Sequence, residues 1–250
     1  MKKQMVNNYY TARKSKLLKD FGNVAKVMKK VLVSHYGNEF AEVVAGETRQ
    51  EFEALIPQLP YIGGGKNRLT ESLIGAVWFL ALYTVLKKHD KTVEEVGKIS
   101  YESSEAYLSS LSSLSKLGLH FYGRMMFTGV GKKLIKSQAT LSQKRQYPED
   151  WVWSFIEGDG KEFDFGMDFI ECAVCKFFHS QGADEFTRFA CLTDFPMSKF
   201  TGSGLVRTMT LAEGAEKCDF RYKRGREVKQ GWPPEFLKSN VSGGVIDTSP

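Results

Sequence analysis

The spacing of apolar residues along this chain changes its period once, near Pro148. Before that point apolar side chains recur every three or four residues, as from Leu17 to Leu32, which is the period of an amphipathic helix. After it, the segments 151–156 and 163–169 alternate apolar with polar or small residues, as a strand with one buried face does. A helical first part followed by strands and short helices predicts an α+β fold with an antiparallel sheet.

Several helices are predicted in the first 146 residues. In TVEEVG, Thr92 and Glu95 stand three residues apart and form a capping box. Gly37 is a plausible helix stop. The stretch IPQLPYIGGGKN has two prolines and three consecutive glycines, which indicate a loop. The helices are expected over about 12–35, 39–55, from Asn67 or Thr70 onward, from 92 to 113 and from 117 to 143.

The remainder of the chain predicts a hairpin–helices–hairpin module. The first hairpin covers 151–169, and LVRTMT pairs with CDFRYK in the second. Short helices are expected between them over 170–178, 184–193 and 196–200. We therefore divide the chain into a helical region, 1–146, an α+β module, 147–228, and a loosely ordered tail, 229–250. The short connection QYPEDW favours close packing, so one integrated domain stays open as an alternative.

The charge balance does not indicate a nucleic-acid partner. The formal net charge is +6, but the basic residues are scattered over the 250-residue chain, as on a solvated surface. The most apolar stretch, Leu73–Leu86, is shorter than the roughly 20 residues that span a bilayer. We expect a buried helix there and no membrane partner.

The cellular compartment is inferred from the amino terminus and the cysteines. MKKQMVNNYYTARK contains no apolar signal segment. Four cysteines in a chain of this length do not indicate a disulfide-stapled secreted protein. We expect free thiols in a reducing cytoplasm.

All four cysteines lie between residues 172 and 218. Cys172 and Cys175 share one face of a predicted helix, and with Cys191 and Cys218 they could ligate zinc or an iron–sulfur cluster. A second CxxC pair is missing, however, and cysteines often pack as small apolar residues. We expect no metal.

Arg207 and Cys218 are candidates for the wall of a pocket. Strand alternation points Cys218 inward and places Arg207 on the face of Leu205 and Met209. An arginine on an apolar face needs a carboxylate partner or an anionic ligand. The available carboxylates are Glu213, Asp194 and Glu171.

The glycine loop YIGGGKN is a further candidate. Its glycines let backbone amides approach a ligand, and Asn67 would cap the next helix. The spacing matches neither a P-loop nor a dinucleotide motif, and a flexible turn with a helix cap is the alternative.

Three segments in this order resemble the L-2-amino-thiazoline-4-carboxylic acid hydrolase family. They are PYIGGGKNRLTESLIGAVWFLALYTVLKKHDKTVEEVG, ECAVCKFFHSQGADEFTRFACLTDF and RTMTLAEGAEKCDFRYKRG. The resemblance covers about residues 15–225, and its most specific part is TLAEGA followed by CDFR. It implies hydrolysis of a small cyclic amidine-like substrate without a redox cofactor. In the reaction that names the family, water adds to C2 of the thiazoline ring, sulfur leaves, and N-carbamoyl-L-cysteine forms.

Such a reaction needs a nucleophile or an activated water, an acid for the leaving sulfur and a cation for the substrate carboxylate. We expect Cys218 or Cys175 to act as nucleophile or thiol acid. Asp194 or Glu213 would be the general base, and Arg207 would hold the carboxylate. The polarising donors would be Asn67 and the backbone amides of Gly63, Gly64 and Gly65.

A non-catalytic small-ligand-binding or sensor protein is the alternative function. The hydrolase hypothesis predicts that Cys218, Arg207 and Asn67 meet at one cavity. The alternative predicts an apolar cavity without converging polar groups. In both cases the expected partner is a small molecule, and a homo-oligomer stays open.

Overall fold

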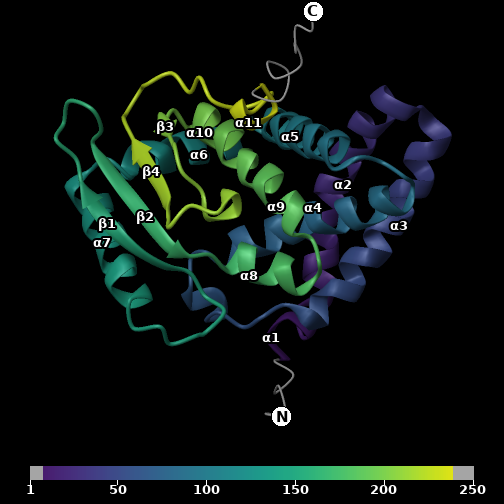
Figure 1. Ribbon diagram of the computed structural model, residues 1–250, viewed down its shortest axis with the longest axis horizontal. Coiled ribbons are helices and arrows are strands. Elements are labelled where there is room, and N and C mark those ends of the chain that lie inside the picture. The colour runs from purple at the N-terminus through teal and green to yellow at the C-terminus, as the bar shows by residue number, and fades with distance from the viewer. Residues whose placement is uncertain (1–7, 239–250) are drawn as a thin grey trace, which may run out of the picture.

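The first part of the chain is helical in the computed structural model, which describes residues 8–238 (Figure 1). Its helices are α1 (Asn8–Thr11), α2 (Lys14–Tyr36), α3 (Asn38–Leu55), α4 (Thr70–Lys88), α5 (Val93–Ser110), α6 (Ser113–Met125) and α7 (Gly129–Ser142). Between α3 and α4 the chain forms only two short 3-10 turns, η1 (Ile56–Gln58) and η2 (Gly64–Lys66). This order confirms the helical region and the loop predicted from the sequence.

Helix α4 forms the centre of the helical part. It contacts α3, α5, α8 and α9. Within the described residues it is the one helix long and apolar enough to cross a membrane, but 61% of its apolar window is buried inside the protein. Leu73, Val77 and Leu82 have no exposed surface. Burial on several sides explains its near-continuous apolar sequence, and confirms the predicted buried helix.

Local signals set most of the helix ends. The Thr92 hydroxyl accepts the N–H of Glu95 at 3.2 Å, and the Glu95 carboxylate accepts the N–H of Thr92 at 2.9 Å. This is the predicted capping box. Gly37 ends α2 with a φ of 83°. Helix α4 starts differently from the expectation, because its N-cap is Leu69. The Asn67 side chain instead accepts the N–H of Leu69 at 2.9 Å.

The single helix predicted over 117–143 is two helices, and glycine explains the break. Chain direction changes between Met125 and Gly129, and Thr128 caps α7 by accepting the N–H of Gly131 at 3.0 Å. A Cβ atom at Gly131 would lie 2.0 Å from the carbonyl oxygen of Met125. The backbones at this corner approach so closely that only glycine fits.

The sheet has four antiparallel strands in the order β1-β2-β4-β3. They are β1 (Val152–Glu157), β2 (Phe165–Glu171), β3 (Leu205–Val206) and β4 (Cys218–Tyr222). β1 and β2 form the first predicted hairpin. The helical first part and the antiparallel sheet in the second confirm the α+β fold class.

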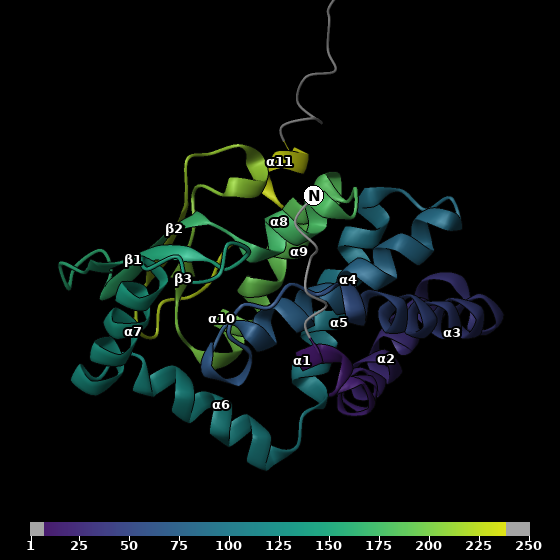
Figure 2. The same cartoon turned by 90° about the horizontal axis from the view of Figure 1, so that it is seen from below.

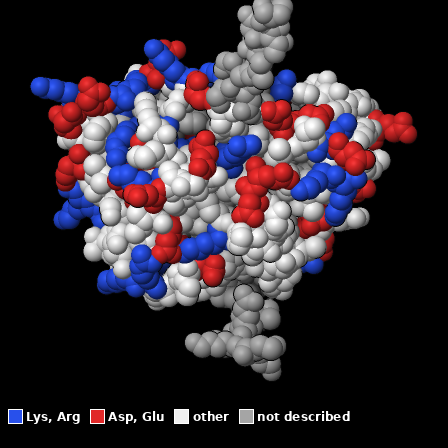
Figure 3. Space-filling view, in the orientation of Figure 1, with Lys and Arg blue, Asp and Glu red and all other residues white. Residues whose placement is uncertain are grey.

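The two faces of the sheet differ in chemistry, as the alternation predicts. One face carries an aromatic cluster in which the rings of Phe155 and Phe165 lie 5.7 Å apart and those of Phe165 and Tyr222 lie 5.1 Å apart. This face meets Phe127, from the corner between α6 and α7, at 5.4 Å. On the other face Asp168 binds cations of β4 and its flank. Figure 3 shows that basic and acidic side chains mix over one side of the molecule.

The second hairpin is shorter than predicted. β3 pairs with β4 only at Leu205–Tyr222 and Val206–Arg221. Beyond that point the Asp219 carboxylate takes over, accepting the N–H groups of Thr208 at 2.8 Å and Met209 at 2.7 Å. One backbone bond persists there, from the N–H of Asp219 to the carbonyl of Met209 at 3.3 Å, so the side chain adds to the backbone pairing. Residues 207–217 leave the regular ladder as a loop with one 3-10 turn, η4 (Leu211–Glu213).

Three short helices connect the hairpins: α8 (Ala173–Ser180), α9 (Asp184–Ala190) and α10 (Asp194–Thr201), with η3 (Cys191–Thr193) before α10. β2 continues to Glu171, so α8 begins later than the predicted residue 170. The start of the tail packs against α5 and α9, because Trp232 contacts the rings of Tyr101 and Phe189. It includes α11 (Glu235–Lys238), and residues 239–250 lie outside the described residues.

We expect Gly131→Ala to lower the free energy of unfolding by about 2 kcal/mol or more, as overpacking does. The methyl group would meet the carbonyl of Met125. Gly129→Ala is the matched control, because a Cβ there meets nothing within 4 Å. Urea unfolding of both variants checks this, and equal stabilities would contradict the close approach.

Asp168 supports a stability prediction that depends on pH. Its carboxylate accepts hydrogen bonds from Lys217 at 2.5 Å and Arg221 at 2.7 Å, with 13% of the side chain exposed. Burial raises its pKa, but Arg221 and Lys217 outweigh this effect and hold the pKa below its usual value. Asp168→Asn should lower the free energy of unfolding by about 2 kcal/mol at pH 7.

Because the pKa is lower in the folded state, this stabilisation is present above the unfolded pKa of about 3.9 and is lost as pH falls through the folded value. The difference between wild type and Asp168→Asn should therefore shrink in urea titrations carried out at lower pH. Glu157→Gln is the control, since that carboxylate pairs with Lys136 but is 66% exposed. A pH-independent difference at Asp168 would contradict the prediction.

Candidate functional site

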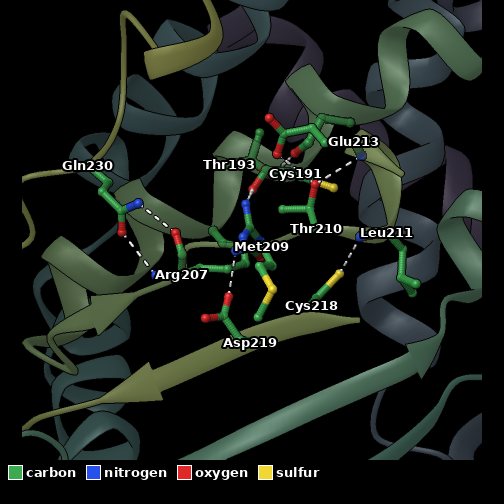
Figure 4. A network of polar contacts seen from close by, with 12 residues as sticks. Cys191, Thr193, Arg207, Met209, Thr210, Leu211, Glu213, Cys218, Asp219 and Gln230 are labelled. Carbon is green, nitrogen blue, oxygen red and sulfur yellow. Dashed lines mark hydrogen bonds and ion pairs between the residues drawn. The ribbon is translucent and has the colours of Figure 1, made fainter. Parts of the chain in front are cut away.

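The four cysteines and an arginine–aspartate pair form one cluster between the sheet and the short helices. Cys218 begins β4, Cys172 directly follows β2, and Cys191 begins η3. The charges of Arg207 and Asp194 act on the thiols of both Cys191 and Cys218. Figure 4 shows Arg207, Cys191 and Cys218 approaching from three separate segments. The fold thus brings together residues that are up to 46 positions apart in sequence, from 172 to 218.

Arg207 forms a buried ion pair with Asp194. Its Nη1 lies 2.6 Å from the Asp194 carboxylate, its Nη2 donates to the carbonyl of Cys191 at 3.0 Å, and 3% of its side chain is exposed. The guanidinium also lies 5.2 Å from the centre of the Phe195 ring and 4.9 Å from that of Phe220. Of the three carboxylates considered from the sequence, Asp194 is the partner.

The Asp194 carboxylate is partly desolvated, yet solvent reaches its side chain. Burial raises its pKa, and Arg207 opposes this only in part. Yet 45% of the side chain is accessible. A raised pKa and an accessible side chain occur together when protein surrounds a carboxylate that water can still reach. A raised pKa and solvent access are properties that a general base needs, and the role of Asp194 as general base stays a prediction.

Cys172 differs from the other thiols of the cluster in the direction of its pKa shift. It is the N-cap residue of α8, and the groups that lower its pKa are the thiol of Cys175, the backbone N–H groups of Val174 and Cys175, and the indole of Trp151. The bond from Cys175 is the largest cause, and together these donors lower the Cys172 pKa although burial opposes them. A helix N-terminus stabilises a thiolate in the same way.

The other three thiols are held protonated. The hydrogen bond to Cys172 and burial raise the pKa of Cys175, and burial raises that of Cys191. Burial also raises the pKa of Cys218 to about 11, although its sulfur accepts the N–H of Leu211 at 3.2 Å. Protonated thiols beside a thiolate can serve as acids.

Sequence reasoning missed Cys172 as a reactive residue. It placed Cys172 inside a helix starting at 170, whereas β2 runs to Glu171 and the helix begins at Ala173. A CxxC pair directly after a strand would have indicated a cysteine at a helix N-terminus, which is where thiolates are favoured.

The glycine loop lies at another place, beside a cavity of about 400 Å³. Asn67 donates to the carbonyl of Ile62 at 2.7 Å and to the carboxylate of Asp150 at 2.8 Å, so its polar atoms hold the loop together. Residues lining this cavity include Gly63, Asn67, Asp150, Trp151, Trp153 and Phe169. Gly64 and Gly65 are not among them. Trp151 links the cavity to the cluster through its hydrogen bond to Cys172.

A second cavity, of about 370 Å³, lies on the other side of the cluster. Arg207 and Glu213 line it together with Arg188, Thr210 and Trp232. The Glu213 carboxylate accepts the hydroxyl of Thr210 at 2.7 Å. The predicted residues are thus divided between two cavities, and Cys218, Cys175 and Asp194 line neither. The meeting of Cys218, Arg207 and Asn67 at one cavity is not found among the residues that the structure describes.

The metal alternative finds no geometric support in residues 8–238. No group of three or more His, Cys, Asp or Glu side chains within that range is placed to hold a metal ion. All four cysteines are free thiols.

Comparison with known proteins identifies the family. The sequence model of the L-2-amino-thiazoline-4-carboxylic acid hydrolase family matches residues 72–222, more than half of the 250-residue chain. The chain belongs to this family. No curated protein and no solved structure matches it. The matched segment of this family member contains the whole cluster, whereas Asn67 and the glycine loop precede it.

We expect Cys172 to be the first thiol alkylated by iodoacetamide near pH 6.5. Its pKa is lowered from the ordinary value of about 8.5, so a larger share is thiolate at that pH. The other three have raised pKa values and should react at least about tenfold more slowly. Mass spectrometry of peptides after timed labelling measures each rate. Faster labelling of Cys191 or Cys218 would contradict the assignment.

Proposed function

We propose that the protein is a cytoplasmic hydrolase that opens a small cyclic amidine-like substrate, such as L-2-amino-thiazoline-4-carboxylate, to N-carbamoyl-L-cysteine. The observation that carries the proposal is the thiolate-stabilising environment of Cys172, in one cluster with Asp194 and Arg207. Family membership supplies the substrate class. A reducing cytoplasm keeps the four thiols free.

In the proposed first step the Cys172 thiolate attacks C2 of the ring. The bond between C2 and the ring sulfur breaks, and its electron pair goes to that sulfur. The leaving sulfur takes the proton of Cys175, whose thiol already donates to Cys172. The product of this step is an isothiourea joined to Cys172 through sulfur.

In the second step water attacks the same carbon. Asp194 accepts one proton of the water, the second moves to a urea nitrogen, and the oxygen becomes the urea carbonyl. The C–S bond to Cys172 breaks and restores the thiolate. The proton on Asp194 returns to Cys175, so the sum is the addition of one water to the substrate.

The remaining predicted residues keep supporting roles in the proposal. Arg207 lines the 370 Å³ cavity and stays the candidate for holding the substrate carboxylate, beside its pairing with Asp194. Cys218 stays a second thiol acid, and Glu213 a second base. Asn67 and the amides of Gly63, Gly64 and Gly65 stay candidate donors, although Asn67 already binds Asp150.

One observation favours the ligand-binding alternative. The 400 Å³ cavity is walled mainly by aromatic and aliphatic side chains, and none of the cysteines lines it. A protein that only binds a small apolar molecule would use such a cavity without chemistry.

Turnover of L-2-amino-thiazoline-4-carboxylate separates these functions. We expect wild type to form N-carbamoyl-L-cysteine, detected by mass spectrometry. Cys172→Ser and Asp194→Asn should each lower kcat by about a thousandfold. Cys175→Ala should lower it less, and Cys191→Ala, a matched thiol without an assigned role, should stay within about threefold.

The activities of these variants distinguish the possible nucleophiles. Full activity of Cys172→Ser with loss in Asp194→Asn would replace covalent attack by direct attack of water. Loss of turnover in Cys218→Ala alone would identify Cys218 of β4 as the nucleophile. No product from folded wild type would exclude this substrate and favour the ligand-binding alternative.

A further inference from the structure

Helix α6 exposes its apolar side. Leu114, Leu117 and Phe121 share one face by helical spacing and are 80%, 66% and 69% exposed. The opposite face packs on α10, where a Cβ at Gly123 would lie 2.4 Å from the carbonyl of Thr201. Figure 2 shows α6 along the lower edge of the molecule, with α10 on its inner side. An amphipathic helix normally buries the side that α6 exposes.

Helix α7 extends this apolar surface. Val130, Leu134 and Leu141 share a face by spacing and are 70%, 39% and 48% exposed. Leu134 and Leu141 also line the 400 Å³ cavity, as does Tyr122 of α6, which is 47% exposed. The exposed surface is therefore continuous with an apolar cavity. Its extent exceeds the scattered single residues that ordinary protein surfaces show.

The charged residues within this segment have one sign, although Lys136 and Arg145 pair with Glu157 and Glu171 of the sheet. Residues 106–148 contain no Asp or Glu and seven Lys or Arg. Arg124, Lys133 and Lys144 are exposed, and none of these three forms an ion pair with a described carboxylate. By helical spacing Lys133 shares the side of α7 that carries Val130, and Lys144 follows the end of α7, three residues after Leu141. The basic residues scattered elsewhere lie among acidic ones, as Figure 3 shows.

We propose that α6 and α7 dock on an anionic lipid surface, with the apolar stripes in the interface and the cations at the headgroups. A basic helix pair with exposed leucine and phenylalanine has the composition of a peripheral membrane anchor. A second copy of the chain would place like charges against each other, and a nucleic acid would leave the stripes without a partner. The proposal departs from the expectation of no membrane partner, which considered spanning segments.

The test is sedimentation with lipid vesicles. Wild type should bind vesicles of phosphatidylcholine with 30–40% phosphatidylglycerol, a composition chosen as a probe of roughly cellular anionic content, and bind pure phosphatidylcholine at least about tenfold more weakly. Raising the salt concentration should weaken binding, because the Debye length shortens from about 10 Å at 0.1 M. Leu117→Glu/Phe121→Glu should lower the partition coefficient at least about tenfold.

Val43→Glu is the matched control, because Val43 is 47% exposed on α3 but lies outside the basic region. It should bind like wild type. Circular dichroism and unfolding curves establish that the variants fold, and Arg124→Glu/Lys133→Glu provides a second, purely electrostatic variant. Wild type that ignores anionic vesicles, or binding that the α6 variant retains, overturns the proposal. A dimer that dissociates in the α6 variant, without lipid binding, would assign the surface to a second copy.

Discussion

The ion pair between Arg207 and Asp194 holds the second half of the protein together. Asp194 begins α10, and Arg207 is the first residue after β3, so the pair ties the short helices to the sheet edge. The guanidinium also holds the carbonyl of Cys191 and stacks near Phe220 of β4. Removing Asp194 would leave the buried guanidinium of Arg207 without its counterion, which costs several kcal/mol. The position of the Cys191 backbone depends on this geometry.

The same pair shapes the chemistry around it. A guanidinium next to Cys191 and Cys218 lowers the cost of a negative charge nearby, while burial works against it. Only the pKa of Cys172 is lowered, because a neighbouring thiol, the backbone N–H groups of a helix terminus and an indole favour its thiolate. One lowered and three raised thiol pKa values thus arise from identical side chains in different local surroundings.

Much of the fold could be predicted from the sequence because local signals agreed with the tertiary structure. The capping box at Thr92, the stop at Gly37 and the alternation in β2 each act within a few residues, and each is found as predicted. Predictions failed where contacts between residues distant in sequence determine where a helix or strand ends. The break between α6 and α7 depends on a backbone approach at Gly131, and past the end of the short β3 the Asp219 carboxylate binds the N–H groups of Thr208 and Met209.

The candidate site follows the same rule. Alternation correctly turned Cys218 and Arg207 inward, since both are buried. The choice among three carboxylates for Arg207, and the separation of Asn67 from the cluster, depend on how the short helices fold back on the sheet. Cys172 was missed through an error of three residues in the start of α8, which moved it from the helix terminus to the interior.

Trp151 has a consequence for how this protein responds to ligands. Its side chain lines the 400 Å³ cavity and donates a hydrogen bond to Cys172. A molecule that enters the cavity and tilts this indole changes how strongly the thiolate is stabilised. By thermodynamic reciprocity, ionisation of the thiol must then change the affinity of the cavity by the same factor. Binding of a molecule in the mostly apolar 400 Å³ cavity and ionisation of the Cys172 thiol outside it are therefore coupled.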